Sequence, residues 1–504
     1  MSTPKLIPLL LLASAAVSTP ARATPLLELA GSFGDLGGQQ GRAASNGASA
    51  AYFNPALLVD VPSGITAGVL VLGDHIDVNL GARTNAANAV PNDLSSAGHA
   101  NADAWDGYPL GTDILEHGRV ETPSQSATAP RPRGAQNGGH DVLTYEAIGI
   151  VAQLFKQRLS VGFYGLIPNK NFLRLSTFYV DEREQYLSNS LHPEMYSDRL
   201  EPLAMAAGAG FRITDDFSLG LGTTFVITAP ASTPVYVASA NDLTNLTINI
   251  DAKGHIGLAP HGGFSYRPFP RWRITGTLHA PQKQVVTANI KFLLGSGLEQ
   301  GSGLTFVFDW MPWQASLGTS FDLVQSDENT VSLVASAVYG RWSQYIDRHA
   351  ERPLPGLGWQ DTITGALGLR GMFGTFGAGL DLQYKPTPVP PQFGRTNYVD
   401  NDRVGANLSL EYGFEVFETQ MKVGFATQLL WMIERSVRKL TPPTYPDGRS
   451  RTPSLVKDEV PDDGQVGGEP IPGAHGVQTN NPGWPGFSSG GFVATAGLSL
   501  SVNL

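Results

Sequence analysis

The last residues of the chain alternate between apolar and polar without a break, from Phe492 to Leu504. Because successive side chains of a β-strand point to opposite faces, this segment predicts a strand with one apolar and one largely polar face. The predicted apolar face carries Phe492, Ala494, Ala496, Leu498, Leu500, Val502 and Leu504. A chain that ends on such a strand is typical of a bacterial outer-membrane β-barrel, which closes on itself.

The first residues have the pattern of a secretory signal peptide. Lys5 precedes an apolar run, Leu6–Val17, and a small-x-small cleavage site follows at Ala21–Ala23. The run is too short to span a bilayer as a helix, and no later stretch has the roughly eighteen consecutive apolar residues of a transmembrane helix. We expect residues 1–23 to be removed, and we expect the mature chain to lie in the cell outer membrane.

The composition fits an envelope protein. The chain has no cysteine, a net charge of −10, and charged residues at only 15% of its positions. The low charged fraction argues against the alternative class, a soluble periplasmic or secreted protein. No basic block suggests a nucleic-acid partner. No HExxH or GxSxG pattern occurs, so we expect no enzyme activity, no catalytic residue, no metal site and no cofactor.

Half-apolar segments recur along the chain and are joined alternately by short turns and long polar connections, as in bacterial barrels. A soluble β-sandwich also alternates, but it rarely uses so many strands of about ten or more residues. The count is about fourteen, an even number, and it predicts an all-β fold: a transmembrane antiparallel β-barrel over residues 64–504. The predicted strands are Gly64–Leu80, Val142–Leu154, Leu159–Leu175, Leu203–Ile213, Phe217–Thr228, Thr247–Tyr266, Trp272–Leu294, Leu304–Val324, Thr330–Tyr345, Thr362–Met372, Thr375–Tyr384, Arg403–Tyr412, Glu418–Ile433 and Gly491–Leu504.

Aromatic residues and two long connections complete the pattern. The connections, residues 81–140 and 436–488, are rich in glycine and proline and have no periodicity, so we expect outer loops. Aromatic residues near predicted strand ends are expected to form interfacial girdles. They are Trp272, Trp310, Trp313, Trp342, Tyr345 and Trp431.

The segment before the barrel, residues 24–63, does not show the alternation of apolar and polar residues that predicts a strand. It is rich in glycine and alanine, which allow close backbone approach, and it contains an Asn-Pro turn signal at Asn54-Pro55-Ala56. A compact segment of this size can fill the lumen of a barrel as a hatch. The alternative is a plain linker.

Three stretches resemble the FadL-like family of outer-membrane transporters for long-chain fatty acids and other hydrophobic compounds. Ala50–Ala56 resembles the Asn-Pro-Ala hatch motif of that family. Tyr384–Gln392, with Asn397–Arg403, resembles its Pro-Val-Pro outer loop and the start of the next strand. Trp310–Gly318 resembles a Pro-x-x-x-x-Leu-Gly strand. The chain departs from the family at its last residue, Leu504, where such barrels usually end in an aromatic residue, and in its longer loops.

The resemblance implies a fourteen-stranded barrel plugged by an N-terminal hatch, and passive transport of hydrophobic molecules. It makes Asn54, Pro55 and Ala56 the hatch motif. Leu187, Leu191 and Met195 recur at four-residue spacing, which predicts a short amphipathic helix and a candidate outer hydrophobic groove. Pro168 and Asn169 interrupt a predicted strand and are the candidate for the strand kink through which members of the family release ligand sideways.

Two other functions stay open at this point: a porin for polar solutes, and a surface interaction protein that acts through its long loops. The partners we expect are a hydrophobic small-molecule ligand, outer-membrane lipids and lipopolysaccharide, and the barrel-assembly machinery. No oligomer signal is visible, so we expect a monomer.

Overall fold

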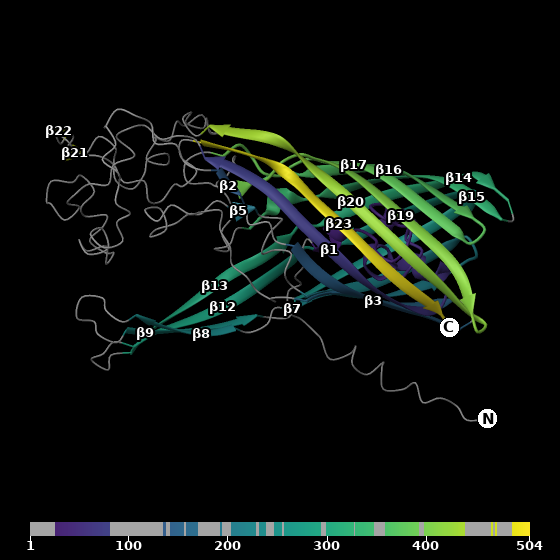
Figure 1. The fold of residues 1–504 in the computed structure, drawn as a ribbon, viewed down its shortest axis with the longest axis horizontal. Helices are drawn as coiled ribbons and strands as arrows, with labels where there is room; N and C mark the ends of the chain where they lie inside the picture. The colour runs from purple at the N-terminus through teal and green to yellow at the C-terminus, as the bar shows by residue number, and fades with distance from the viewer. Residues whose placement is uncertain are drawn as a thin grey trace, which may run out of the picture.

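Fourteen antiparallel strands form a closed barrel in a computed structural model of the chain (Figure 1). The residues that the structure describes are 26–80, 135–137, 142–155, 158–169, 192–193, 203–227, 231–237, 246–254, 257–293, 299–326, 328–346, 358–392, 398–438, 465–466, 469–470 and 486–504. In hydrogen-bonded order the barrel strands are β1 (Gly64–Leu80), β3 (Val142–Leu154), β4 (Leu159–Pro168), β6 (Leu203–Arg212), β7 (Phe217–Ile227), β10 (Gly257–Phe269), β11 (Trp272–His279), β14 (Gln314–Gln325), β15 (Asn329–Gly340), β16 (Thr362–Phe373), β17 (Phe376–Lys385), β19 (Arg403–Val416), β20 (Thr419–Arg438) and β23 (Gly486–Asn503).

The first and last barrel strands close the sheet. Residues Gly64–Leu80 of β1 pair with Phe487–Asn503 of β23, and residues Gly64–Gly73 also pair with Val142–Val151 of β3. Closure gives β1 a strand partner on both sides over Gly64–Gly73, and a membrane-spanning sheet requires such pairing because lipid cannot hydrogen-bond its backbone. The prediction of an all-β fourteen-stranded barrel is confirmed.

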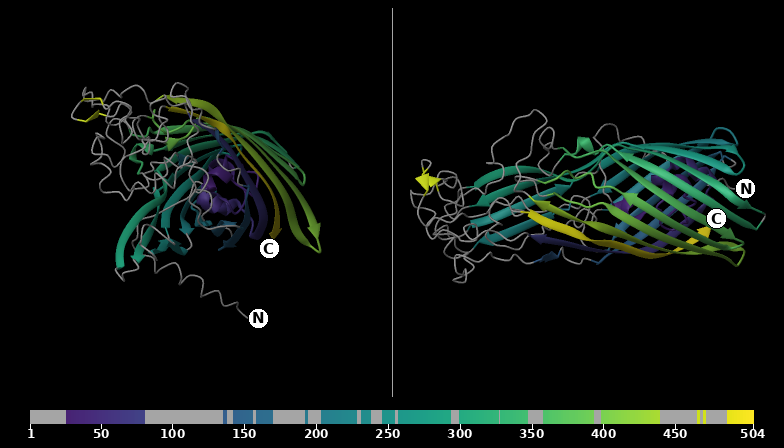
Figure 2. Two further views of the ribbon diagram at one scale, coloured as in Figure 1. Left: turned by 60° about the vertical axis from the view of Figure 1, so that its left-hand side comes forward. Right: turned by 90° about the horizontal axis from the view of Figure 1, so that it is seen from above.

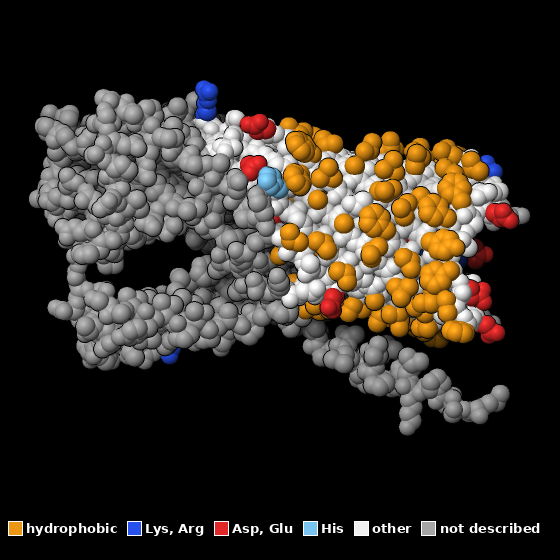
Figure 3. All heavy atoms as spheres, in the orientation of Figure 1, with side chains coloured by type: hydrophobic (Ala, Val, Ile, Leu, Met, Phe, Trp, Pro, Cys, Tyr) orange, Lys and Arg blue, Asp and Glu red, His pale blue; other side chains and the backbone are white. Residues whose placement is uncertain are grey.

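The two faces of the wall differ as the alternation predicts. In β23, Leu498 and Leu500 are exposed on the outside, whereas Ser499 and Ser501 are buried inside. Figure 3 shows apolar side chains spread over the outer face of the barrel, with acidic and basic side chains at its two ends. Such a belt matches the hydrocarbon core of a membrane, because contiguous apolar surface of this extent is rare on soluble proteins. No helix among the described residues is both long and apolar enough to cross a membrane.

Residues 26–63 lie inside the barrel (Figure 2). This hatch consists of three short α-helices and one 3₁₀-helix, connected by glycine-rich loops, and most of its side chains are buried. The elements are α1 (Leu26–Ala30), α2 (Gly41–Ala44), α3 (Ala50–Phe53) and η1 (Pro55–Asp60). Residues 24 and 25, and the predicted signal peptide 1–23, lie outside the described residues.

The predicted strands Thr247–Tyr266, Trp272–Leu294 and Leu304–Val324 are wrong as single strands, because each is divided in two. Their outer halves, with a strand that follows β7, form a separate four-stranded sheet that extends away from the barrel (Figure 1). Pro281 and Pro312 lie at two of the divisions, and proline interrupts a strand because it has no N–H to donate. The sheet comprises β13 (Glu299–Met311), β12 (Gln282–Leu293), β9 (Leu246–Gly254) and β8 (Ala231–Val237).

Other boundaries differ by less. β20 and β23 extend into the predicted loop 436–488, as far as Arg438 and from Gly486. β4 ends at Pro168, and residues 170–175 lie outside the described residues. Short elements lie in the long connections: β2 (Ala135–Asn137), β5 (His192–Pro193), η4 (Trp342–Gln344), β18 (Tyr398–Val399), β21 (Gln465–Val466) and β22 (Glu469–Pro470).

A charge on the outer face tests whether that face meets lipid. Leu367, in the middle of β16, is 53% exposed on this face. We predict that Leu367→Arg lowers the free energy of unfolding in liposomes by about 2–4 kcal/mol, as at a bilayer midplane. The matched control is Ile213→Arg beside the β6–β7 turn, where Ile213 is equally exposed and the loss is expected to be about 0–1 kcal/mol. Equal losses, measured by urea titration, would mean that the barrel wall does not face hydrocarbon.

Candidate functional site

The predicted hatch motif forms the junction between α3 and η1 and is fully buried. The Asn54 side-chain oxygen accepts a hydrogen bond from the Ala56 N–H at 3.2 Å and so caps η1. Its Nδ2 donates to the carbonyl of Arg42 in α2 and to that of Phe264 in β10. One asparagine side chain thus ties two hatch elements to the barrel wall, and Pro55 starts η1 at a position that needs no N–H.

The wall behind this motif is lined by glycine on β6, β7 and β10. A Cβ at Gly220 of β7 would overlap the backbone of Pro55 and Ala56, and one at Gly263 of β10 would overlap the Asn54 amide. A Cβ at Gly210 of β6 would lie 2.5 Å from the Pro55 carbonyl oxygen. These glycines therefore permit direct backbone contact between hatch and wall, which side chains of any size would prevent.

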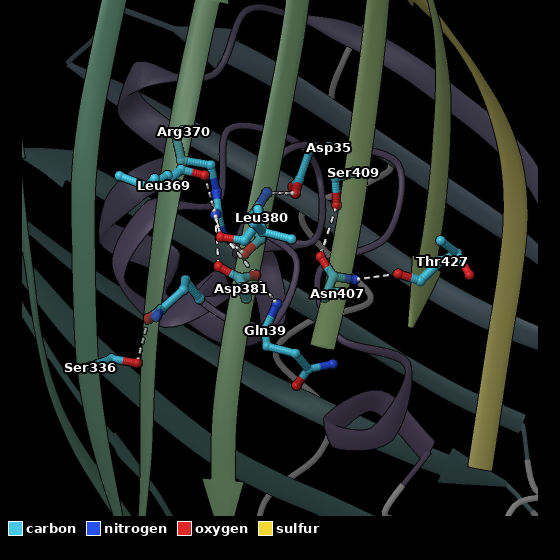
Figure 4. Close-up of polar contacts among 12 residues, drawn as sticks. Asp35, Gln39, Ser336, Leu369, Arg370, Leu380, Asp381, Asn407, Ser409 and Thr427 are labelled. Carbon is cyan, nitrogen blue, oxygen red and sulfur yellow. Dashed lines mark hydrogen bonds and ion pairs between the residues drawn. The ribbon is translucent and has the colours of Figure 1, made fainter. Parts of the chain in front are cut away.

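Hydrogen bonds attach the opposite side of the hatch to β15, β16 and β17 (Figure 4). Arg370 Nη2 of β16 donates to the Gly37 carbonyl at 2.7 Å and to the Asp381 carboxylate of β17 at 2.9 Å. The same carboxylate accepts from the Gln39 N–H at 2.9 Å. Gly38, between Gly37 and Gln39, has φ +50°. A Cβ at this position would overlap the side chains of Asn407 and Asp381. The loop 37–39 therefore fits the wall only with glycine at its centre.

The C-terminal end of the hatch is held by a cluster of charges at the end of the barrel where the short turns lie. Asp60 accepts from Arg212 at 2.6 Å, from Arg267 at 2.5 Å and from Arg273 at 2.8 Å. These arginines come from β6, β10 and β11, so one carboxylate connects the hatch to three strands. In bacterial outer-membrane barrels the end with the short turns is the periplasmic one.

A second charged group lies deeper in the lumen. Glu28 of α1 accepts two hydrogen bonds from Arg42 of α2, at 2.8 and 2.5 Å, and one from the Tyr52 hydroxyl at 2.5 Å. Burial raises the pKa of Glu28, but the charge and hydrogen bonds of Arg42 and the hydroxyl of Tyr52 outweigh it and hold the pKa below its usual value. Arg42 also donates to Gln314 of β14 at 2.5 Å. Glu28 is therefore a charged partner of Arg42 inside the barrel.

Two histidines of the wall pack against the same tyrosine. His261 of β10 and His279 of β11 stack with ring centroids 4.7 Å apart, and the edge of Tyr52 contacts both rings. The carbonyl of Ala51 lies 2.7 Å from His261 Nε2, so this nitrogen carries the proton and donates. The pair thus adds to the attachment of α3.

Basic side chains of β17 and β19 line the lumen at the loop end of the barrel. Arg403 is 2% exposed, and its guanidinium lies 3.3 Å from the Asp400 carboxylate. Lys385 pairs in register with Arg403 and lies on the inward face of β17, which alternates with the exposed Leu382 and Tyr384. The charges of Arg403, Glu28, Asp400 and Arg42 act on its ammonium group. Among the described residues, Lys385 has no hydrogen-bond or ion-pair partner.

Three residues predicted for the aromatic girdles, Trp310, Trp342 and Tyr345, are instead buried in one cluster at the loop end. Trp359 and Tyr398 complete it, and the rings of Tyr345 and Trp359 stack 3.6 Å apart. The girdle prediction is wrong for these three because their rings pack on one another: Trp310 lies near the end of β13 in the outer sheet, and Trp342 and Tyr345 lie in the connection after β15. The other predicted girdle residues, Trp272, Trp313 and Trp431, are exposed on the barrel strands or beside them.

Two predicted sites, the outer groove and the strand kink, stay predictions. Leu187, Leu191 and Met195 lie outside the described residues, so the outer groove stays a prediction. Pro168 is the last residue of β4, and the Asn169 N–H still donates to Thr144 of β3 at 2.9 Å. The strand kink also stays a prediction. No group of three or more histidine, aspartate and glutamate side chains that could hold a metal occurs in the described part of the chain.

Fold and site together define a class: a transmembrane β-barrel that holds its own N-terminal segment in the lumen. No protein-family model matches the sequence, and no curated protein matches it. Among solved structures, the chain is similar to a FadL homologue of Pseudomonas aeruginosa, with a TM-score of 0.49 and 15% identity over 96% of this chain and 98% of that one. It is also similar to the toluene transporter TodX of P. putida (TM-score 0.44, 11% identity, 92% and 95% covered). The toluene transporter TbuX of Ralstonia pickettii has a TM-score of 0.42 at 12% identity, with 96% and 99% covered.

A methyl group on the glycine wall tests the contact with the hatch. We predict that Gly220→Ala lowers the free energy of unfolding by about 1–3 kcal/mol, because the new Cβ overlaps the backbone of Pro55 and Ala56. We also expect proteolysis within the hatch to become faster. Gly365→Ala in β16 is the control, since a Cβ there meets nothing within 4 Å. The same stability and proteolysis for both variants would mean that the hatch does not lie against β7.

Proposed function

We propose that the protein transports hydrophobic molecules across the bacterial outer membrane, passively, and that its preferred substrates carry an acidic head group, as long-chain fatty acids do. The observation that carries the proposal is the ammonium of Lys385 inside the lumen, which makes no side-chain hydrogen bond or ion pair with the described residues, although the charges of Glu28 and Asp400 act on it. Arg42 is paired with Glu28, and Arg403 with Asp400, which leaves the ammonium of Lys385 without a described partner. Lys385 is half-buried, and a partly desolvated ammonium gains from an anionic partner within hydrogen-bond distance, so the site favours an anionic ligand.

The surroundings of Lys385 suit the rest of such a molecule. The buried aromatic cluster of Trp310, Trp342, Tyr345, Trp359 and Tyr398 lies at the same end of the barrel, and we propose that an acyl chain packs beside it. A carboxylate bound to Lys385 and Arg403 would gain charge-assisted hydrogen bonds, and its chain would be shielded from water.

The packing of the hatch against the barrel wall favours a gated pathway rather than an open pore. Its side chains and backbone contact β3, β6, β7, β10 and β14–β17, and Gln428 of β20 donates to the Leu29 carbonyl at 2.9 Å. A general porin for polar solutes needs a water-filled lumen, which this packing opposes. We propose that ligand leaves the lumen when the hatch moves, or sideways where β4 ends at Pro168 and Asn169.

The role of Lys385 is tested by comparing the uptake of a long-chain fatty acid with that of the fatty alcohol of the same length. We predict that Lys385→Gln lowers cellular uptake of a radiolabelled long-chain fatty acid about tenfold, because a charged hydrogen bond of about 1.5 kcal/mol is lost. Uptake of the fatty alcohol of the same length should not change, and Lys385→Arg should restore acid uptake.

The control is Lys422→Gln, which removes a lysine already paired with Glu411 at 3.4 Å near the opposite end of the barrel. This variant should transport acid and alcohol as the unaltered protein does. Acid uptake that is unaffected by Lys385→Gln would contradict the proposed head-group site. No uptake of either compound above that of cells lacking the protein would contradict transport itself.

A further inference from the structure

A cavity of about 390 Å³ lies between the hatch and the barrel wall at the turn end. Leu36 and Ala43 of the hatch form part of its lining, together with Val334 of β15 and Met372 of β16. Its volume is within the range of small-molecule binding sites, and these four side chains give it an apolar side. We call this cavity the vestibule. It lies at the turn end of the barrel, whereas Lys385 lies in the lumen at the loop end.

The polar side of the vestibule is strongly basic. Its lining residues include four arginines, Arg267, Arg271, Arg273 and Arg370, but only one acidic residue, Asp322. Arg267 and Arg273 share Asp60 with a third arginine, and Arg370 pairs with Asp381. The side chain of Arg271 is exposed and has no hydrogen-bond or ion-pair partner among the described residues. The lining therefore has more positive than negative charge, which attracts anions into a concave site.

The hatch helix α2 lies between contacts on the lumen side and the lining of the vestibule. In α2, Arg42 contacts Glu28 and Gln314 on the lumen side, while the next residues, Ala43 and Ala44, line the vestibule. A Cβ at Gly318 of β14 would lie 2.6 Å from the Ala43 Cβ, so α2 contacts the wall closely at this strand.

We propose that the vestibule is a second binding site, for the carboxylate of an amphipathic acid whose chain lies along the apolar side. The inference rests on the proposed function, because the occupant is the transported acid after it has passed α2. Arg271 is the residue free to pair with the carboxylate, and the other arginines keep the site positive while they hold the hatch.

The absence of cysteine in the chain makes a thiol reporter unambiguous. Ser320 of β14 lines the vestibule and makes no side-chain hydrogen bond with the described residues, so Ser320→Cys is a mild change. In purified protein in detergent, we expect an anionic methanethiosulfonate to modify this thiol faster than a cationic one. The ratio of the two rates should fall at least about threefold when Arg271→Gln is added, because a local positive potential raises the rate of anion encounter.

Ligand protection completes the experiment. Decanoate should slow modification of the thiol, and decanol should not. The control reporter is Thr214→Cys, on the exposed β6–β7 turn beside Asp215 and Asp216, where decanoate should have no effect. Equal rates with both reagents, or no protection by decanoate, would overturn the inference. If acid uptake still depends on Lys385 in that case, the proposed function stands and only the vestibule site is wrong.

Discussion

The close contact between the hatch and the inner wall is the constraint on which the rest of the site depends. It requires glycine where backbone meets backbone, at Gly210, Gly220 and Gly263 of the wall and at Gly38 of the hatch. Buried hydrogen bonds from Asn54 and Arg370 then fix the hatch on two opposite sides. Because barrel closure leaves no free sheet edge, these inward contacts are what position the hatch.

The same contacts divide the interior into two basic regions. Lys385 and Arg403 lie at the loop end, and Arg271 and its neighbours lie at the turn end. The Glu28–Arg42 pair joins α1 to α2, and Ala43 and Ala44 of α2 line the pocket at the turn end. An amphipathic acid could therefore exchange one set of cationic partners for another, provided that α2 moves. A weak second site of this kind favours release as well as capture.

The sequence predicted the barrel well and its interior poorly, for physical reasons. Strict alternation identifies strands such as β1 and β3 to the residue, because one face must be apolar along the whole membrane span. It could not separate β11 from β12, since Pro281 lies within a run whose alternation continues into the outer sheet. A proline in the middle of a predicted strand was the available signal.

The residues of the lumen were harder to predict. Alternation places Lys385 and Arg403 on an inward face, but many polar residues share that property, and only the fold shows which ones lack a partner. Trp310, Trp342 and Tyr345 lie at strand ends, as girdle residues do, and their burial depends on how their rings pack on one another. Asn54-Pro55-Ala56 was singled out from sequence as an Asn-Pro turn signal that resembles the hatch motif of the FadL-like family, whereas its role in capping η1 is visible only in the structure.

The most direct measurement of the central claim, that the hatch lies against the wall and must move for transport, is uptake through a barrel whose hatch is locked by a disulfide. A Cβ at Gly162 of β4 would lie 3.4 Å from the Ala51 Cβ of α3, near the distance a disulfide needs, with only the tip of Leu58 to displace. We expect the double variant Ala51→Cys, Gly162→Cys to form this bond under oxidation and to lose fatty-acid uptake. Reduction of the same cells should restore uptake. Full uptake with the bond intact, or failure of the bond to form in a folded barrel, would contradict the claim.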